Sequence, residues 1–137
     1  MSLDLLATDL RTMQLFYHNC HNTVSGIAFA SDHSFFGDAY AAAEGDYDSI
    51  VERLMGLGKE VNIHQINAKA ATTLQHVPAQ LEPSEMFKLA LGFEHQLAQT
   101  CEKCDKDPSY TAGTRNLVGA IADAAEVRIY KIKQRIK

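Results

Sequence analysis

The 137-residue sequence contains no tryptophan, only three prolines and only three cysteines. A chain of this length buries a sizeable core without disulfides, and three is an odd number, so we expect reduced thiols in a cytoplasmic protein. No apolar run approaches the ~20 residues that span a bilayer. No basic segment precedes an apolar stretch near the N-terminus, so we expect no signal peptide. The net charge of −4 argues against a chain built to coat nucleic acid.

What the sequence does contain is helical periodicity along its whole length. Apolar residues recur every three or four positions, which predicts helices over 3–23 and 30–57, a third that begins at Pro83, and a fourth that follows Pro108. Residues 59–82 form a long connection, in which we expect a short helix over 63–71. No alternating strand pattern or internal repeat is present. The fold class predicted for residues 1–137 is therefore all-α: one domain, a four-helix bundle with one long crossover, as in ferritin-like bundles.

The candidate metal ligands are His21, His33, Asp48 and Glu52. His33 and Glu52 are nineteen positions apart on one predicted helix, so they lie roughly 28 Å apart at ~1.5 Å per residue. One metal ion cannot contact both residues of one straight helix. A second, antiparallel copy of the helix removes this difficulty, and the sequence therefore predicts a metal site at a dimer interface.

The two-fold crossing is predicted between Ala42 and Ala43. This register places position 33 opposite 52 and position 37 opposite 48, because both pairs of residue numbers sum to 85. Alanines at 41–43 are small enough for two helices to approach closely. Imidazole and carboxylate ligands suit iron, and zinc would also fit.

The residues that carry a family resemblance lie mostly between positions 10 and 58. They are His21-Asn22-Thr23-Val24-Ser25-Gly26, Phe29, His33, Asp48-Ser49-Ile50-Val51-Glu52-Arg53 and Leu57-Gly58, with a weaker match at Asp107-Pro108-Ser109-Tyr110-Thr111-Ala112. This pattern resembles the Dps family, the mini-ferritins (DNA-binding proteins from starved cells) of the ferritin-like superfamily. The resemblance implies a dodecameric hollow shell that oxidises Fe(II), usually with hydrogen peroxide, and stores the ferric product. It also implies iron sites with histidines from one subunit and carboxylates from its two-fold partner.

The sequence departs from the family pattern at three positions. Gly37 replaces an aspartate four residues after the second histidine, Asn22 replaces a common tryptophan, and Gly113 replaces an aspartate of the last helix. Asp38 lies ~100° around the helix from position 37, so it is no simple replacement. The ferroxidase set is therefore incomplete, and a shell with a decayed site is the alternative. A carboxylate at position 37 would point into the site, so Gly37→Asp is expected to raise iron affinity.

Each candidate also has an ordinary structural interpretation. The histidines could be polar helix residues, Asp48 could pair with Arg53, and Glu52 could pair with a nearby cation. Cys101 and Cys104 form a CxxC without a second pair, which favours inert thiols over a zinc site. Four carboxylates near the last turn and helix could line a three-fold pore or be ordinary surface charge: Asp105, Asp107, Asp123 and Glu126.

Cations gather at the C-terminus: Arg128, Lys131, Lys133, Arg135 and Lys137. Positive charge at the end of a helix complements the helix dipole, which is the simpler interpretation. The alternative is a weak DNA contact multiplied by the copies in a shell. The first helix is predicted to begin directly after Met1 and Ser2, so we expect no Lys-rich N-terminal tail of the kind that condenses DNA in the Dps family.

Overall fold

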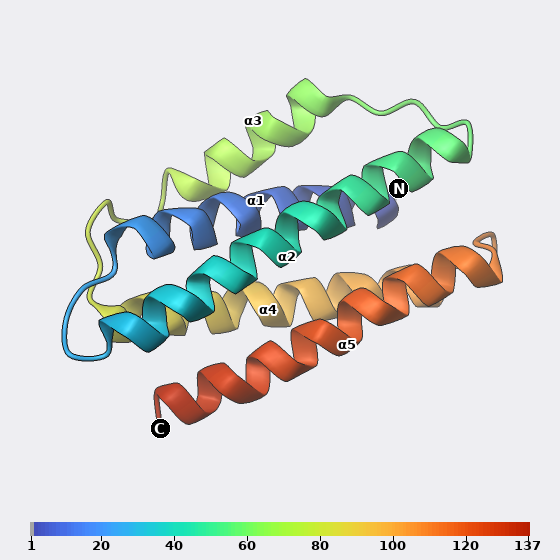
Figure 1. Cartoon of the computed structure of the whole chain (residues 1–137). Coiled ribbons are helices and arrows are strands. Elements are labelled where there is room, and N and C mark those ends of the chain that lie inside the picture. Colours follow the sequence, from blue (N-terminus) through green and yellow to red (C-terminus); the bar gives the residue numbers. More distant parts are fainter. Residues whose placement is uncertain (1) are drawn as a thin grey trace.

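The computed structural model describes residues 2–137, which form five helices and no strand (Figure 1). The helices are α1 (Ser2–Thr23), α2 (Phe29–Gly56), α3 (Ile63–Leu74), α4 (Pro83–Asp105) and α5 (Ala112–Arg135). Helices α1 and α2 are antiparallel, as are α4 and α5, and the long connection through α3 makes α2 and α4 run in the same direction. The predicted four-helix bundle with a short helix in its crossover is confirmed.

Most of the helix boundaries agree with the sequence prediction. Helix α1 ends at Thr23 and α4 begins at Pro83, where the backbone N–H of Glu82 donates to the Glu85 carboxylate at 3.0 Å. Helix α3 is longer than predicted, since it continues to Leu74. Its start is fixed by Asn62, whose side chain accepts a hydrogen bond from the Gln65 N–H.

Pro108 does not stand at the start of the last helix. Helix α5 begins at Ala112, and Thr111 caps it by accepting from the Thr114 N–H at 3.2 Å. Pro108 belongs instead to the preceding turn, in which the Asp107 carboxylate accepts from both the N–H and the hydroxyl of Ser109. These two bonds favour ionised Asp107 and lower its pKa.

The core lies between the four long helices, and α3 covers α1 from outside (Figure 1). Along α2 the buried positions recur every three or four residues and include Phe36, Ala39, Ala43, Ile50 and Leu54. This spacing leaves the opposite face of α2 open along its whole length. Over residues 2–137, no helix combines the length and apolar character needed to cross a bilayer.

Candidate metal centre

His21 and His33 face each other across the turn that joins α1 to α2. Nδ1 of His21 lies 2.8 Å from the carbonyl oxygen of His33, and Nδ1 of His33 lies 2.9 Å from the carbonyl oxygen of His21. The two rings stack with centroids 3.7 Å apart and an angle of 20° between their planes. Gly26 makes the connecting turn possible, because its φ of 105° lies in the left-handed region that favours glycine.

These two hydrogen bonds decide which ring nitrogens are available to a metal. A carbonyl oxygen only accepts, so each Nδ1 must carry the proton and donate it. In the neutral ring this leaves the lone pair on Nε2. Neither Nε2 atom of His21 or His33 has a hydrogen-bond partner within the described chain. The pair therefore presents two imidazole rings that are oriented by backbone carbonyls and could act as ligands, the arrangement in which outer-shell partners hold metal-binding histidines.

Aromatic rings extend the histidine pair in both directions. Phe29 stacks on His33 with centroids 4.9 Å apart, and Tyr40 meets the His21 ring edge-on at 5.3 Å. His18 also stacks on Tyr40, with centroids 4.4 Å apart, which places it one ring away from the candidate site. These contacts restrict how far the two imidazoles can rotate.

Gly37 lies directly beside His21. A Cβ atom built on Gly37 would be 3.0 Å from both Cε1 and Nδ1 of that ring. Position 37 therefore lies next to the histidine pair, as its spacing from His33 on the helix indicates. The expectation of a simple gain from Gly37→Asp overlooks this contact, because a side chain here requires the His21 ring to shift by a few tenths of an ångström.

We expect Gly37→Ala to weaken Fe(II) binding by roughly tenfold, the lower end of the range for disturbed outer-shell support of metal ligands. Gly37→Asp displaces the ring in the same way but adds a hard oxygen ligand, so it should bind more tightly than Gly37→Ala. Anaerobic calorimetric titration of the three proteins separates the two effects. Equal affinity of the alanine and aspartate variants would mean that a carboxylate at position 37 does not reach the metal.

Asp48 and Glu52 lie on the exposed face of α2, beyond its midpoint. Neither forms an ion pair within residues 2–137, and Arg53 donates instead to the Thr114 hydroxyl at 3.3 Å. The described part of a single chain brings no three His, Cys, Asp or Glu side chains together around one point. Within one chain the four predicted ligands thus form two separate groups, a histidine pair and a carboxylate pair.

The interior of the bundle contains a polar cluster that sequence reasoning missed. Glu94 of α4 is fully buried, accepts from the Tyr17 hydroxyl at 2.5 Å and pairs with Arg128 of α5 at 2.6 Å. Burial and the nearby Glu94 charge raise the pKa of Tyr17, and burial also raises the pKa of neighbouring Asp46. A guanidinium neutralises Glu94 here, so the centre of this bundle does not offer a free carboxylate cage for iron. The missed signal is that Glu94 and Arg128 occupy positions on otherwise apolar helix stripes.

A sequence profile of the ferritin-like domain matches residues 3–107. The chain belongs to the ferritin-like family. This ferritin-like chain is 29% identical, over 96 residues, to a nutrient stress-induced DNA-binding protein of Synechococcus sp.. The match covers 70% of this chain and 52% of that protein, so the chain spans about half the length of its curated relative.

Solved structures resemble the ferritin-like chain over nearly its whole length. Antigen TpF1 from Treponema pallidum superposes with a TM-score of 0.86 at 19% identity, covering 99% of this chain and 89% of that one. Dps92 from Deinococcus radiodurans superposes with a TM-score of 0.79 at 19% identity, covering 97% of this chain and 82% of that one. Dps from Thermosynechococcus elongatus superposes with a TM-score of 0.74 at 18% identity, covering 99% of this chain and 88% of that one. At these identities the likeness establishes the fold, and the resemblance to Dps proteins is confirmed.

Two of the C-terminal cations of the ferritin-like chain form ion pairs inside the subunit. Arg128 binds Glu94, and Arg135 makes two hydrogen bonds of 2.9 Å to Asp32 in the first turn of α2. The Arg135 pair joins the end of α5 to the turn that carries His33 (Figure 1). This leaves three exposed lysines, at positions 131, 133 and 137, as candidates for contact with an anionic surface.

The cysteines are free and buried, as the inert-thiol interpretation predicts. Burial raises the pKa of Cys20 and Cys101 to about 12 and that of Cys104 to about 11. Thiols with such pKa values remain protonated at neutral pH, which disfavours metal binding through the CxxC.

Proposed function

We propose that the protein is a mini-ferritin subunit that oxidises Fe(II) at two-fold interfaces and stores the ferric product inside a hollow, dodecameric shell. Such storage would protect the cell from radical chemistry driven by peroxide. The observation that carries the proposal is the reciprocal bonding of His21 and His33, which leaves both Nε2 atoms free as ligands. The carboxylates would come from Asp48 and Glu52 of the partner subunit.

The exposed face of α2 supports a close two-fold contact. Small residues occupy its middle, namely Ala41, Ala42, Gly45 and Ser49, and all four are exposed in the isolated chain. Open space surrounds Gly45, since a Cβ added there would meet no atom within 4 Å. Small residues let two helix backbones approach, which the proposed register between Ala42 and Ala43 requires.

The two ends of α2 also complement each other in this register. Phe29, near the histidine pair, is 45% exposed, and the register places it opposite Gly56 of the partner. Gly56 lines a hollow of about 460 Å³ together with Glu52, Leu57 and Leu117. An aromatic side chain entering this hollow would bring the turn that carries His33 close to the partner's Glu52.

The proposed chemistry follows from these ligands. Two imidazoles and two carboxylates bind Fe(II), and the hard carboxylate oxygens favour the ferric ion after electron loss. Each Fe(II) gives one electron, so one hydrogen peroxide and two protons oxidise two Fe(II) to two Fe(III) and yield two waters. Dioxygen is the other candidate oxidant. Zinc at the same ligands would act only as a substitute that blocks turnover, because it has no redox chemistry.

Gly37 favours a second candidate function, a shell that assembles without oxidising iron. Position 37, beside the His21 ring, has no carboxylate, and the site would then be a remnant in a structural or DNA-protecting assembly. DNA contact would depend on the exposed C-terminal lysines and weaken steeply with added salt.

Light scattering and an iron assay on the wild-type protein separate the two candidates. We expect an oligomer, with dodecamer mass, that oxidises Fe(II) under peroxide at least about tenfold faster than buffer, a modest rate enhancement for an enzyme. Oligomers that oxidise iron no faster than buffer would indicate the decayed shell. A monomer at micromolar concentration would contradict both candidates.

A further inference from the structure

A hollow of about 300 Å³ lies between α1, α3 and α4, away from the histidine pair. Leu5, Met13 and Phe93 give it apolar walls. On the α1 side it is also lined by a charged residue, Asp9, and by the hydroxyls of Thr8 and Thr12. Thr73 of α3 and Gln96 of α4 complete the lining, so each of the three helices contributes a polar group. An apolar hollow with a small number of polar groups is the usual form of a small-molecule site.

Asp9 makes no ion pair within residues 2–137, although the charge of Lys103 acts on it from a greater distance. Within the part of the chain described, the side chain of Asp9 accepts a hydrogen bond from the Thr100 hydroxyl of α4, which donates to Oδ2 at 2.6 Å. Burial raises the pKa of Asp9 to about 6, although the Thr100 bond and the charge of Lys103 act in the opposite direction. A carboxylate kept largely from water without a paired cation is costly, which makes it a candidate for function.

The threonine hydroxyls beside Asp9 are available only as acceptors. The Thr8 hydroxyl donates its hydrogen to the Asp4 carbonyl oxygen at 3.0 Å, and the Thr12 hydroxyl donates to the Thr8 carbonyl oxygen at 2.8 Å. Each hydroxyl has one hydrogen, so both oxygens retain lone pairs and no further donor. On its α1 side the hollow therefore presents three oxygen acceptors and a negative charge.

We propose that this hollow binds a primary ammonium group carried on a small apolar body. The three N–H donors of such a group match the carboxylate of Asp9 and the oxygens of Thr8 and Thr12. A cavity of ~150 Å³ holds benzene, so about twice that volume admits a body of one or two rings. The site uses none of the residues assigned to iron, and its occupation is independent of the proposed ferroxidase function.

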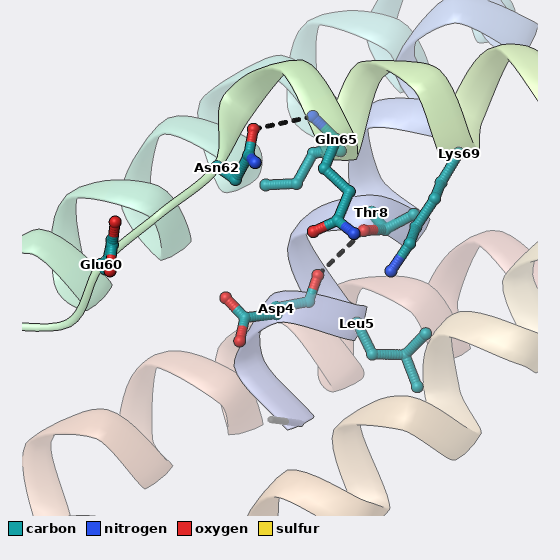
Figure 2. A pocket seen from close by; sticks show the side chains of 8 residues that line it. Asp4, Leu5, Thr8, Glu60, Asn62, Gln65 and Lys69 are labelled. Atoms are coloured by element: carbon teal, nitrogen blue, oxygen red, sulfur yellow. Dashed lines mark hydrogen bonds between the residues drawn. The ribbon is translucent and has the colours of Figure 1, made fainter.

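The neighbouring groove provides an internal comparison. It measures about 730 Å³ and shares Leu5 and Thr8 with the smaller hollow, but Asp4, Glu60 and Lys69 line it (Figure 2). In Figure 2 the amine of Lys69 points into this groove, so a second ammonium there would meet a like charge. Asp4 and Asp9 lie five residues apart on α1, and their asparagine variants form a matched pair.

The test is calorimetric titration of the full assembled protein at neutral pH with 2-phenylethylammonium. Two probes serve as comparisons: 2-phenylethanol lacks the charge, and the trimethylated ammonium keeps the charge but has no N–H. We expect the primary ammonium to bind at least about tenfold more tightly than either comparison, which corresponds to 1.4 kcal/mol. Asp9→Asn should abolish this preference, whereas Asp4→Asn should leave it unchanged.

Asp9→Asn is a mild change, because the amide oxygen of asparagine can still accept from Thr100. Circular dichroism and light scattering should match those of the wild-type protein. Three results would overturn the proposal: no binding of the primary ammonium, equal binding of 2-phenylethanol, or an equal loss in the Asp4→Asn protein.

Discussion

A one-to-one mixture of His33→Ala and Glu52→Ala subunits, unfolded and reassembled together, is expected to regain Fe(II) oxidation that neither variant shows alone. Each homogeneous variant should lose at least about tenfold to a hundredfold in rate, since losing a ligand costs no less than losing an outer-shell partner. Both variants should still assemble, because the changes remove exposed or half-buried polar groups and leave the core filled. A homogeneous protein in which every subunit carries both substitutions should remain inactive after the same treatment.

The recovery follows from the two-fold symmetry of the proposed interface. Each dimer has two equivalent sites, and each site takes histidines from one subunit and carboxylates from the other. In a mixed dimer, one site contains both substitutions and the other contains neither. Random pairing makes half of the dimers mixed, so about a quarter of the wild-type sites should return in a symmetric interface.

The matched control mixes His33→Ala with His21→Ala. Both substitutions then affect the histidine group, every site in a mixed dimer lacks one imidazole, and no recovery is expected. A stopped-flow measurement of Fe(II) oxidation, with assembly confirmed by light scattering, checks both mixtures. Equal recovery in the two mixtures, or none in either, would mean that the ligands are not divided between subunits as proposed.

The helices could be predicted because local signals agree with the packing. The apolar stripe of α2 and the Pro83 start of α4 are both explicit in the sequence. Helix α3 extends past its predicted end to Leu74, and the Leu74 side chain packs against the core there. Helix α5 follows Pro108 as predicted, but a turn at Asp107–Ser109 and the Thr111 cap occupy the residues between them.

The candidate ligands could be named from the sequence, but the way in which their side chains are held could not. The spacing of His21 and His33 indicates ligands, yet the reciprocal Nδ1 bonds to the two carbonyls depend on the turn at Gly26. Likewise, the space available to a side chain at position 37 depends on where the His21 ring lies. Sequence spacing gives the face of a helix, whereas close contacts depend on how two helices pack.

Glu94→Ala is expected to destabilise the subunit by about 3–5 kcal/mol, the usual cost of removing one partner from a buried ion pair. Arg128 is only 13% exposed and would keep its charge in the core without a counter-ion. Burial alone would lower the pKa of Arg128, but Glu94, together with Tyr17 and Asp46, more than offsets this and the net shift is upward. Tyr17→Phe removes one hydroxyl donor to the charged Glu94, so it should cost about 1.5–3 kcal/mol, the usual contribution of a hydrogen bond to a charged group.

Replacing the whole cluster tests whether the loss comes from the unpaired charge. Glu94→Leu combined with Arg128→Met and Tyr17→Phe leaves no buried polar group of this cluster, and apolar replacement of buried ion pairs is often neutral or stabilising. The triple variant should therefore be more stable than Glu94→Leu alone.

Glu102→Leu, at an exposed position of the same helix, should change stability by no more than about 0.5 kcal/mol. Urea unfolding measures the free energy of unfolding of each variant. All variants are compared at one protein concentration, because the stability of an oligomer depends on concentration. If the triple variant is less stable than Glu94→Leu, the cluster stabilises the bundle through its own bonds and not merely by cancelling charge.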